Sequence, residues 1–315
     1  MRVAALSAGR GGRLDVPGLR VRRAEARAAL GECVLCPRRC RSRRLEGETG
    51  FCGAGAGARV AAVSIHPGEE PPISGTRGSG TVFFSHCNLA CLFCQNYPIS
   101  RMGVGRAMTE KELGERLLWI ERKGAHNVNF VTPTPHVPQL IGGLLAARER
   151  GFSLPVVYNT NGYEVPETLA LLDGVVDIYL PDVKYRSARL AAEASAAPDY
   201  PVHNAAAVAE MLRQAGPLAA GPDGTAVRGV LVRHLVLPGR VDETVAVLAF
   251  LRNRFGAGIP LSLMGQYFPA HRAPGTPGYD RKLSAGEYER AVEAAWGLGL
   301  TNVFIQEIAC PGETT

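Results

Sequence analysis

The stretch 81-TVFFSHCNLACLFCQN-96 joins a short apolar run to a loop that carries three cysteines. The run Thr81–Ser85 does not alternate between apolar and polar residues, which is typical of a strand buried on both faces of a parallel sheet. Cys87, Cys91 and Cys94 follow it directly. In parallel α/β folds the chemistry lies at the carboxyl ends of the strands. The stretch therefore predicts a buried strand that delivers three thiols to that edge.

The same pattern continues to the end of the chain, where short β-type runs alternate with helical segments. Thr109 with Glu112, and Ser284 with Glu287, form capping-box patterns that predict two helix starts. The further strand candidates are Asn127–Thr132, Pro155–Thr160, Val175–Leu180, Gly229–Val236, Leu261–Met264 and Asn302–Ile305. Repeated strand–helix units with buried parallel strands predict an α/β fold, either a barrel or a doubly wound sheet.

Composition limits the class of protein. The chain has 315 residues, 46% of them apolar and 20% charged, which indicates a globular protein with one large domain or slightly more. No apolar run is long enough to span a bilayer, and the N-terminus lacks the apolar stretch of a signal peptide. We therefore expect a cytoplasmic protein without a membrane partner.

The N-terminal part holds a second cysteine set. Its four members lie among glycines and arginines: Cys33, Cys36, Cys40 and Cys52. So polar a segment buries little apolar surface, and a bound metal would substitute for a core. Four thiolates can hold zinc or an auxiliary iron–sulfur cluster, and the spacing leaves that choice open. We expect a metal-binding segment at residues 1–75, followed by a core domain at 76–315.

The spacing of Cys87, Cys91 and Cys94 suits a cubane cluster. Three thiolates on one tight loop can ligate three irons, so the fourth iron lacks a protein ligand and is open to a cofactor or substrate. No further cysteine follows nearby to cap it. The alternatives are buried free thiols, or a zinc site completed by His86 or a distant residue.

Around this loop the sequence resembles the radical S-adenosylmethionine (SAM) superfamily. CNLACLFC at residues 87–94 is similar to the superfamily's cluster motif. The resemblance extends over most of residues 30–308, in particular to a group similar to pyruvate formate-lyase activating enzyme but with a cysteine-rich N-terminal segment. The phrases that carry it include GEEPPISGTRGSG, GAHNVNFVTPTPH, VVYNTNGYE, VDIYLPDVKY and VRHLVLPG. It implies a partial (βα)6-type barrel, with a [4Fe–4S] cluster held by Cys87, Cys91 and Cys94.

The resemblance also implies a cofactor site at the strand ends. The positions that match are Thr132, Thr134, Asn159, Asn161, Asp182, Lys184 and Arg233. TPTP stands where the family usually has a glycine-rich segment that contacts the methionine amino group. Asn159 replaces an acidic residue that helps to hold a monovalent cation in activating enzymes, so that cation is not predicted here. For Asp182, Lys184 and Arg233 the alternative is an ion-pair network at the barrel rim.

These features favour a radical SAM enzyme that cleaves SAM and starts hydrogen abstraction, with a partner protein as the expected substrate. The resemblance implies an electron donor such as flavodoxin or ferredoxin. It names no catalytic residue for the substrate step. Modification of RNA or of a small molecule is the alternative, because residues 1–80 hold 14 Arg against 7 acidic residues. We consider nucleic acid less favoured, since Phe51 is the only aromatic residue in that segment. A non-catalytic electron carrier is the third possibility.

Overall fold

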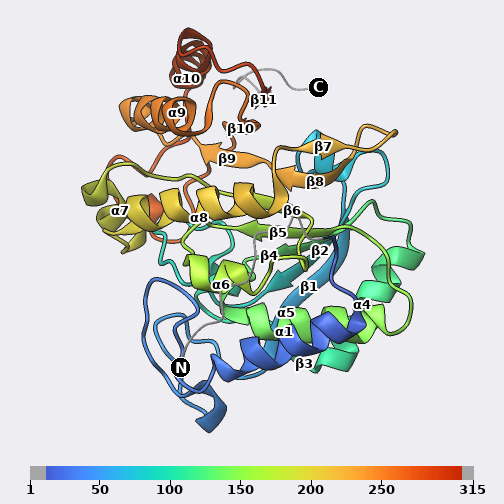
Figure 1. Ribbon diagram of the computed structural model, residues 1–315. Helices are drawn as coiled ribbons and strands as arrows, with labels where there is room; N and C mark the ends of the chain where they lie inside the picture. Colours follow the sequence, from blue (N-terminus) through green and yellow to red (C-terminus); the bar gives the residue numbers. More distant parts are fainter. Residues whose placement is uncertain (1–11, 307–315) are drawn as a thin grey trace.

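The protein folds into two sheets covered by helices (Figure 1). The structure is a computed structural model that describes residues 12–306. One sheet has eight strands in the order β3-β1-β2-β4-β5-β6-β8-β7, and the other has three in the order β11-β10-β9. The strands are β1 (Ala58–His66), β2 (Ser79–Phe84), β3 (Arg106–Met108), β4 (Val128–Val131), β5 (Val156–Thr160), β6 (Ile178–Pro181), β7 (Ala219–Ala220), β8 (Ala226–Val230), β9 (Val232–Leu235), β10 (Leu261–Met264) and β11 (Val303–Ile305).

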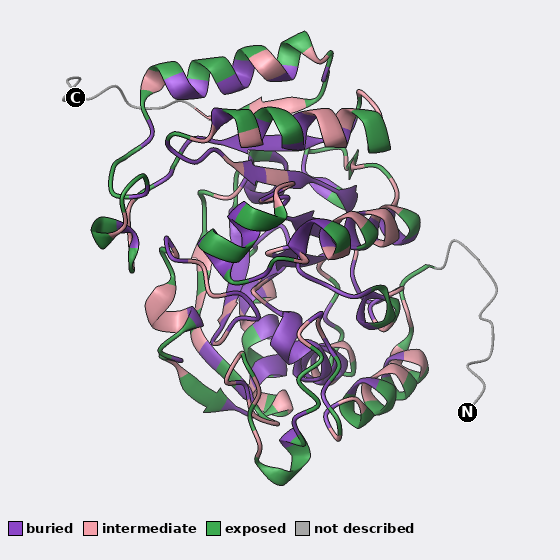
Figure 2. Cartoon of the chain, turned by 90° about the vertical axis from the view of Figure 1, so that its left-hand side faces the viewer, coloured by how far each residue is buried: buried purple, intermediate pink, exposed green. Residues whose placement is uncertain are grey.

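Strand pairing confirms the α/β class and the partial barrel. From β2 to β8 each neighbouring pair in the large sheet is parallel, and β9, β10 and β11 are parallel to one another. A bridge between Asp182 and Arg233 links the two sheets. The central parallel strands β4, β5, β6 and β10 are largely buried, as Figure 2 shows in purple, whereas most of the helices expose their outer faces. Burial on both faces explains why the sequences of these strands are largely apolar runs.

The helices follow the strands in chain order. They are α1 (Val16–Ala28), α2 (Pro71–Ser74), α3 (Tyr97–Ser100), α4 (Glu110–Arg122), α5 (Val137–Arg148), α6 (Pro166–Ala170), α7 (Ala188–Ser195), α8 (Tyr200–Ala215), α9 (Val241–Phe255) and α10 (Ala285–Gly297), with short 3-10 turns at Arg44–Glu46, Thr134–His136 and Ala273–Gly275. Both predicted capping boxes are present, at the starts of α4 and α10. Within residues 12–306 no helix has the length and apolarity to cross a membrane.

The strand expected at residues 229–236 is two strands. β8 pairs with β6 in the large sheet, whereas β9 pairs with β10 in the small one. Gly229 has a φ of 119°, and a Cβ there would lie 2.4 Å from the backbone of Leu218. The chain therefore bends next to this glycine and passes from one sheet to the other, which an apolar run alone does not reveal.

Two elements of the N-terminal part escaped the sequence interpretation. α1 buries only Leu19 and Ala26, so its periodicity is weak, and it begins at Asp15, whose side chain accepts from the Gly18 N–H. β1 pairs antiparallel with β2 and β3 and has one largely exposed face. The segment 1–75 thus contributes a strand to the large sheet, and its separation from residues 76–315 as a domain stays a prediction.

Candidate active site

The three-cysteine loop begins where β2 ends. His86 has a φ of 74°, which turns the chain sharply after the strand, and Cys87 is the next residue. Each thiol has a polar neighbour. Asn161 Nδ2 donates to Cys87 Sγ at 3.2 Å, Ser195 Oγ donates to Cys91 Sγ at 3.0 Å, and Cys94 Sγ lies 3.2 Å from Ser100 Oγ. The loop and its surroundings therefore place hydrogen-bond donors at sulfur, the arrangement that suits thiolate ligands.

The thiols are close enough to influence one another. Burial raises the pKa of Cys87 to about 12, and the charges of Cys91 and Cys94 add to the rise. Burial also raises the pKa of Cys91, although Lys184 opposes it. Three neighbouring thiolates in a buried site need a bound cation to ionise. The donor set therefore fits a metal group better than free reactive thiols.

A cubane cluster fits this set better than a single ion. Among residues 12–306, no three His, Cys, Asp or Glu side chains converge as one metal ion requires. A [4Fe–4S] cluster makes a different demand, because each cysteine ligates its own iron and the sulfurs stay apart. The residues present thus fit three corners of a cluster.

A cavity of about 760 Å³ opens beside the loop. Phe93, Gln95 and Asn96 of the cysteine loop form part of its lining. Strand-end residues form another part, namely Val131, Asn159, Asp182, Lys184, Arg233, Leu235 and Met264. Its volume lies in the range of small-molecule sites. A ligand in this cavity would touch both the cysteine loop and the polar strand ends.

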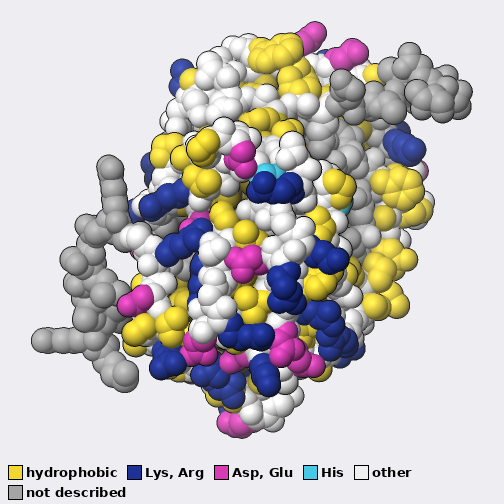
Figure 3. All heavy atoms as spheres, turned by 90° about the vertical axis from the view of Figure 1, so that its right-hand side faces the viewer, with side chains coloured by type: hydrophobic (Ala, Val, Ile, Leu, Met, Phe, Trp, Pro, Cys, Tyr) yellow, Lys and Arg dark blue, Asp and Glu magenta, His cyan; other side chains and the backbone are white. Residues whose placement is uncertain are grey.

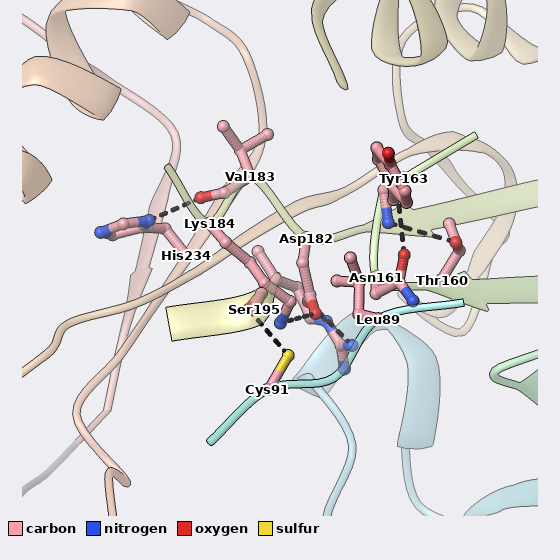
Figure 4. A network of polar contacts seen from close by, with 12 residues as sticks. Leu89, Cys91, Thr160, Asn161, Tyr163, Asp182, Val183, Lys184, Ser195 and His234 are labelled. Atoms are coloured by element: carbon pink, nitrogen blue, oxygen red, sulfur yellow. Dashed lines mark hydrogen bonds and ion pairs between the residues drawn. The ribbon is translucent and has the colours of Figure 1, made fainter. Parts of the chain in front are cut away.

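Asp182 is the centre of the polar network in this cavity. Its carboxylate accepts from Lys184 Nζ at 2.6 Å and from Arg233 Nε at 3.0 Å. Arg233 Nη2 also donates to Asn159 Oδ1 at 2.6 Å. Burial opposes the ionisation of Asp182, but the charges of Lys184 and Arg233 outweigh it and lower the pKa of Asp182. Figure 4 shows Asp182 and Lys184 of this network, with Cys91 and Ser195 beside them.

The remaining sequence-predicted residues lie elsewhere. Asn161 contacts Cys87 Sγ and also donates to Asn88 Oδ1, so it supports the cysteine loop. Thr132 and Thr134 do not line the 760 Å³ cavity. Thr132 has a φ of 56°, and Thr134 is buried and donates to Glu164. Of the predicted cofactor set, the structure therefore gathers Asn159, Asp182, Lys184 and Arg233 and separates the two threonines.

The N-terminal cysteines surround a second, smaller cavity. It is lined by Cys33, Cys36, Cys40 and Cys52 together with Arg44, Asn88 and Thr134. Arg44 Nη1 donates to Cys33 Sγ at 3.7 Å, and burial raises the pKa of Cys36 to about 12. Because Asn88 follows Cys87, the two cysteine sets are neighbours in space. Nothing in the sequence spacing indicates that proximity.

Several polar residues of the site were not anticipated. Glu69 and Glu70 line the large cavity, and Glu164 is fully buried beneath β5 residues that donate to it. Ser100 and Ser195 meet the cysteines only through the tertiary fold. The glutamates lie within the phrases that carry the family resemblance, which is the one signal that could have singled them out.

Fold and site together define an α/β partial barrel with a three-cysteine loop at its strand ends. The radical SAM superfamily matches residues 81–251, more than half of the chain. Uncharacterized protein MJ0674 of Methanocaldococcus jannaschii is 30% identical over 289 residues, 89% of this chain and 78% of the relative. Uncharacterized protein MJ0808 of the same organism is 26% identical over 266 residues, 78% of this chain and 73% of the relative. The chain belongs to the radical SAM superfamily.

Solved structures resemble the chain more distantly. Streptococcus suis SuiB bound to S-adenosylmethionine has 14% identity and a TM-score of 0.47, over 71% of this chain and 48% of that one. HydG, a maturase of the [FeFe]-hydrogenase, has 16% identity and a TM-score of 0.48, over 75% of this chain and 53% of that one. The chain thus spans about half the length of these proteins. Superfamily membership implies a [4Fe–4S] cluster and cleavage of SAM there.

Proposed function

We propose that the protein is an enzyme that reductively cleaves SAM to a 5′-deoxyadenosyl radical, which abstracts hydrogen from a substrate. The cysteine loop is the observation that supports this proposal most strongly. Its three cysteines fit three corners of a cluster, and the same loop borders the 760 Å³ cavity. When bound, the cluster supplies one electron that splits the sulfonium of SAM. Cys87, Cys91 and Cys94 would hold it and leave one iron free for the cofactor.

The cavity residues have defined tasks in this proposal. Arg233 and Lys184 present cations beside the cysteine loop, and a guanidinium suits a carboxylate such as that of SAM. Asp182 fixes both cations, and Asn159 accepts from Arg233. These four residues would therefore orient the methionine part of the cofactor. Asn161 would hold Cys87 in position through its hydrogen bond to the sulfur. Thr132 and Thr134 could contact the cofactor only if it extended beyond the 760 Å³ cavity.

An external protein would supply the electron. In the described part of the chain, Arg38 and Arg59 donate to the backbone carbonyls of Asn88 and Gly103, and the Arg101 guanidinium lies 5.4 Å from the ring of Phe51, so their charges are not paired with carboxylates. Burial lowers the pKa of His86, and the charges of Arg59, Arg44 and Arg101 lower it further. A positive field thus surrounds the residue before Cys87. Such a field suits an acidic donor such as flavodoxin or ferredoxin.

A partner protein is the substrate class that the sequence resemblance supports, as in the activating enzymes. RNA modification has less support, because Arg39, Arg41 and Arg43 pair with glutamates and Arg44 is buried. On the face drawn in Figure 3, Lys and Arg side chains are interspersed with Asp and Glu. A small-molecule substrate would also fit the cavity. A pure electron carrier has no need of a cavity beside its cluster, so that alternative has the least support.

The N-terminal segment is a second metal site in this proposal. Four cysteines line one small cavity, and although no three of them meet at a single point within the described residues, a modest convergence would let them hold zinc or an auxiliary iron–sulfur cluster. The residues 1–75 would then be stabilised by the metal and the residues 76–315 by the barrel core. A cytoplasmic location belongs to the same proposal, because reduced thiols and a cluster require a reducing compartment.

The decisive experiment is an anaerobic assay of cluster and product. Reconstituted protein should show a reduced-cluster signal that shifts on addition of SAM, and 5′-deoxyadenosine should form with a chemical reductant. Cys87→Ala, Cys91→Ala and Cys94→Ala should each abolish both responses. Cys310→Ala, at a position outside the described residues, serves as the matched cysteine control. Full SAM cleavage in any one of the three loop variants would refute the proposal.

A further inference from the structure

The large cavity extends well beyond the cysteine loop. Glu69 and Glu70 lie in the connection between β1 and α2 and line it. At the end of β1, His66 pairs with Ser79, the first residue of β2, whereas the cysteine loop follows the last residue of that strand. The connection after β1 nevertheless brings Glu69 and Glu70 within 4.0 Å of Arg233, which also donates to Asp182 and Asn159. The glutamates, the polar strand ends and part of the cysteine loop therefore line one cavity.

Glu70 is the residue that stands out in this cavity. It is 8% exposed, and its Oε2 atom has no hydrogen-bond partner within residues 12–306. Its backbone is fixed, because its carbonyl accepts from the N–H groups of Ile73 and Ser74. The Glu69 N–H donates to Ser74 Oγ at 2.9 Å. A carboxylate held in this way, buried and only partly satisfied, is costly unless a ligand completes it.

Within residues 12–306, the cations that line the cavity do not form short bonds to Glu70. Arg233 lies 4.0 Å from Glu70 Oε1 and 3.8 Å from Glu69 Oε2, and its short bonds go to Asp182 and Asn159. Lys184 is likewise bound to Asp182. The lining therefore holds three carboxylates, Glu69, Glu70 and Asp182, against the two permanent cations Lys184 and Arg233. Burial raises the pKa of Glu69, the neighbouring charge of Glu70 adds to the rise, and Arg233 opposes it.

We propose that this part of the cavity binds a cationic group of the substrate, a protonated amine or a guanidinium, through Glu70 and Glu69. Such a group would donate hydrogen bonds to the Glu70 carboxylate, which accepts none from the described residues, and would balance the excess of negative charge. Leu235, Met264 and Phe304 in the lining offer apolar contacts for an aliphatic stem. The inference rests on the proposed function, since it takes the cavity beside the cluster as the substrate site. A lysine or arginine side chain of a partner protein and a free amine share this chemistry.

The test measures binding of small probes to the reconstituted holoenzyme with SAM under anaerobic conditions. The probes are n-butylamine and n-butylguanidine, with n-butanol as the neutral probe, and saturation-transfer NMR reports their affinities. We expect the cationic probes to bind at least about tenfold more tightly than butanol. Glu70→Gln should remove most of that preference, and Glu69→Gln should weaken it. Glu115→Gln, a change at a half-exposed helix position, should leave it intact.

The outcomes separate this inference from the proposed function. Equal binding of butanol and butylamine to the wild-type protein would overturn the cation site without the use of any variant. So would an unchanged preference in Glu70→Gln. Formation of 5′-deoxyadenosine by the same wild-type sample tests SAM cleavage independently. A blocked Gly-Lys-Gly peptide that binds more tightly than butylamine identifies a protein segment as the source of the cation, and the reverse order identifies a free amine.

Discussion

Arg233 and Asp182 join the two sheets of the barrel through both side chains and backbone. Arg233 Nε donates to Asp182 Oδ1 at 3.0 Å, and the two residues also form a backbone bridge between the sheets. The N–H of Val183 also donates to the Arg233 carbonyl at 2.8 Å. Asp182 and Arg233 therefore line the cavity and also connect the eight-stranded sheet to the three-stranded sheet. Ligand binding and stability of the fold depend on the same contact.

Replacement of Arg233 should reveal this double role. Arg233→Met leaves Asp182 and the neighbouring Glu70 short of a cation, and breaking a buried pair in this way costs about 3–5 kcal/mol. We expect that loss in anaerobic denaturant unfolding, together with loss of SAM binding. Arg228→Met is the control, because Arg228 is exposed and donates only to backbone carbonyls. Equal unfolding free energies of Arg233→Met and Arg228→Met would show that the junction between the two sheets does not depend on the Arg233–Asp182 ion pair.

Glu164 should make stability depend on pH. Burial raises its pKa from 4.5 to about 7, even though hydroxyls of Thr134, Thr160 and Tyr158 donate to it, and its Oε2 has no partner among the described residues. Between these two pH values the folded state binds more protons than the unfolded state. Stability therefore falls as pH rises through this window, by up to about 1.4 kcal/mol per unit.

Glu164→Gln removes that titration. We expect the variant to gain stability relative to wild type between pH 5 and pH 7.5, measured as the difference in unfolding free energy under anaerobic conditions. Glu115→Gln, at an exposed position, should show no such trend. A difference between Glu164→Gln and wild type that stays constant with pH would mean that the carboxyl is already ionised in the folded protein at pH 5.

The sequence predicted the parts of the fold that depend on local pattern. The buried parallel strands were predictable because both of their faces are buried, so their sequences do not alternate between apolar and polar residues, as in β2 and β5. β1 was missed because one of its faces is largely exposed, and α1 because it buries only Leu19 and Ala26. The three cysteines of the loop were predictable as one group, since all lie within eight residues.

Contacts between distant segments could not be predicted from the spacing. Asn161 reaches Cys87, and Glu70 faces Arg233, only because the barrel brings separate strand ends together. The proximity of Asn88 to the N-terminal cysteines has the same origin. Residue types indicated the chemistry of each group, but the packing decides which groups share a cavity.

The metal content of the N-terminal segment follows from its cysteines. In the triple variant Cys87→Ala/Cys91→Ala/Cys94→Ala, elemental analysis should still find about one zinc, or the iron of a second cluster. The control removes Cys33, Cys36, Cys40 and Cys52 by alanine substitution and should lose that metal. It should also be less stable, because the metal substitutes for a core there. A triple variant that is metal-free yet properly folded would contradict the second site.

The salt dependence of RNA binding tests whether RNA is the substrate, because an affinity that comes from phosphate contacts falls steeply as salt rises. The cysteine-rich segment holds five arginines that could contact phosphates: Arg38, Arg39, Arg41, Arg43 and Arg44. The structure leaves few of them available. Arg39, Arg41 and Arg43 have glutamate partners, and Arg44 is buried and donates to the Gly55 carbonyl. Arg38 lies 3.8 Å above the ring of Phe51, so that aromatic face is not free to stack a base.

We therefore expect no specific binding to total cellular RNA at physiological salt. The measurement is a salt series with the wild-type protein and with a variant in which Arg38, Arg39, Arg41 and Arg43 are replaced by Gln. Arg44 is retained because its replacement would disturb the buried cysteine cavity. Weak binding with the same shallow salt slope in both proteins fits a protein or small-molecule substrate. Tight binding in wild type that the four substitutions abolish would instead place RNA modification first, because phosphate neutralisation by these arginines would then dominate the interaction.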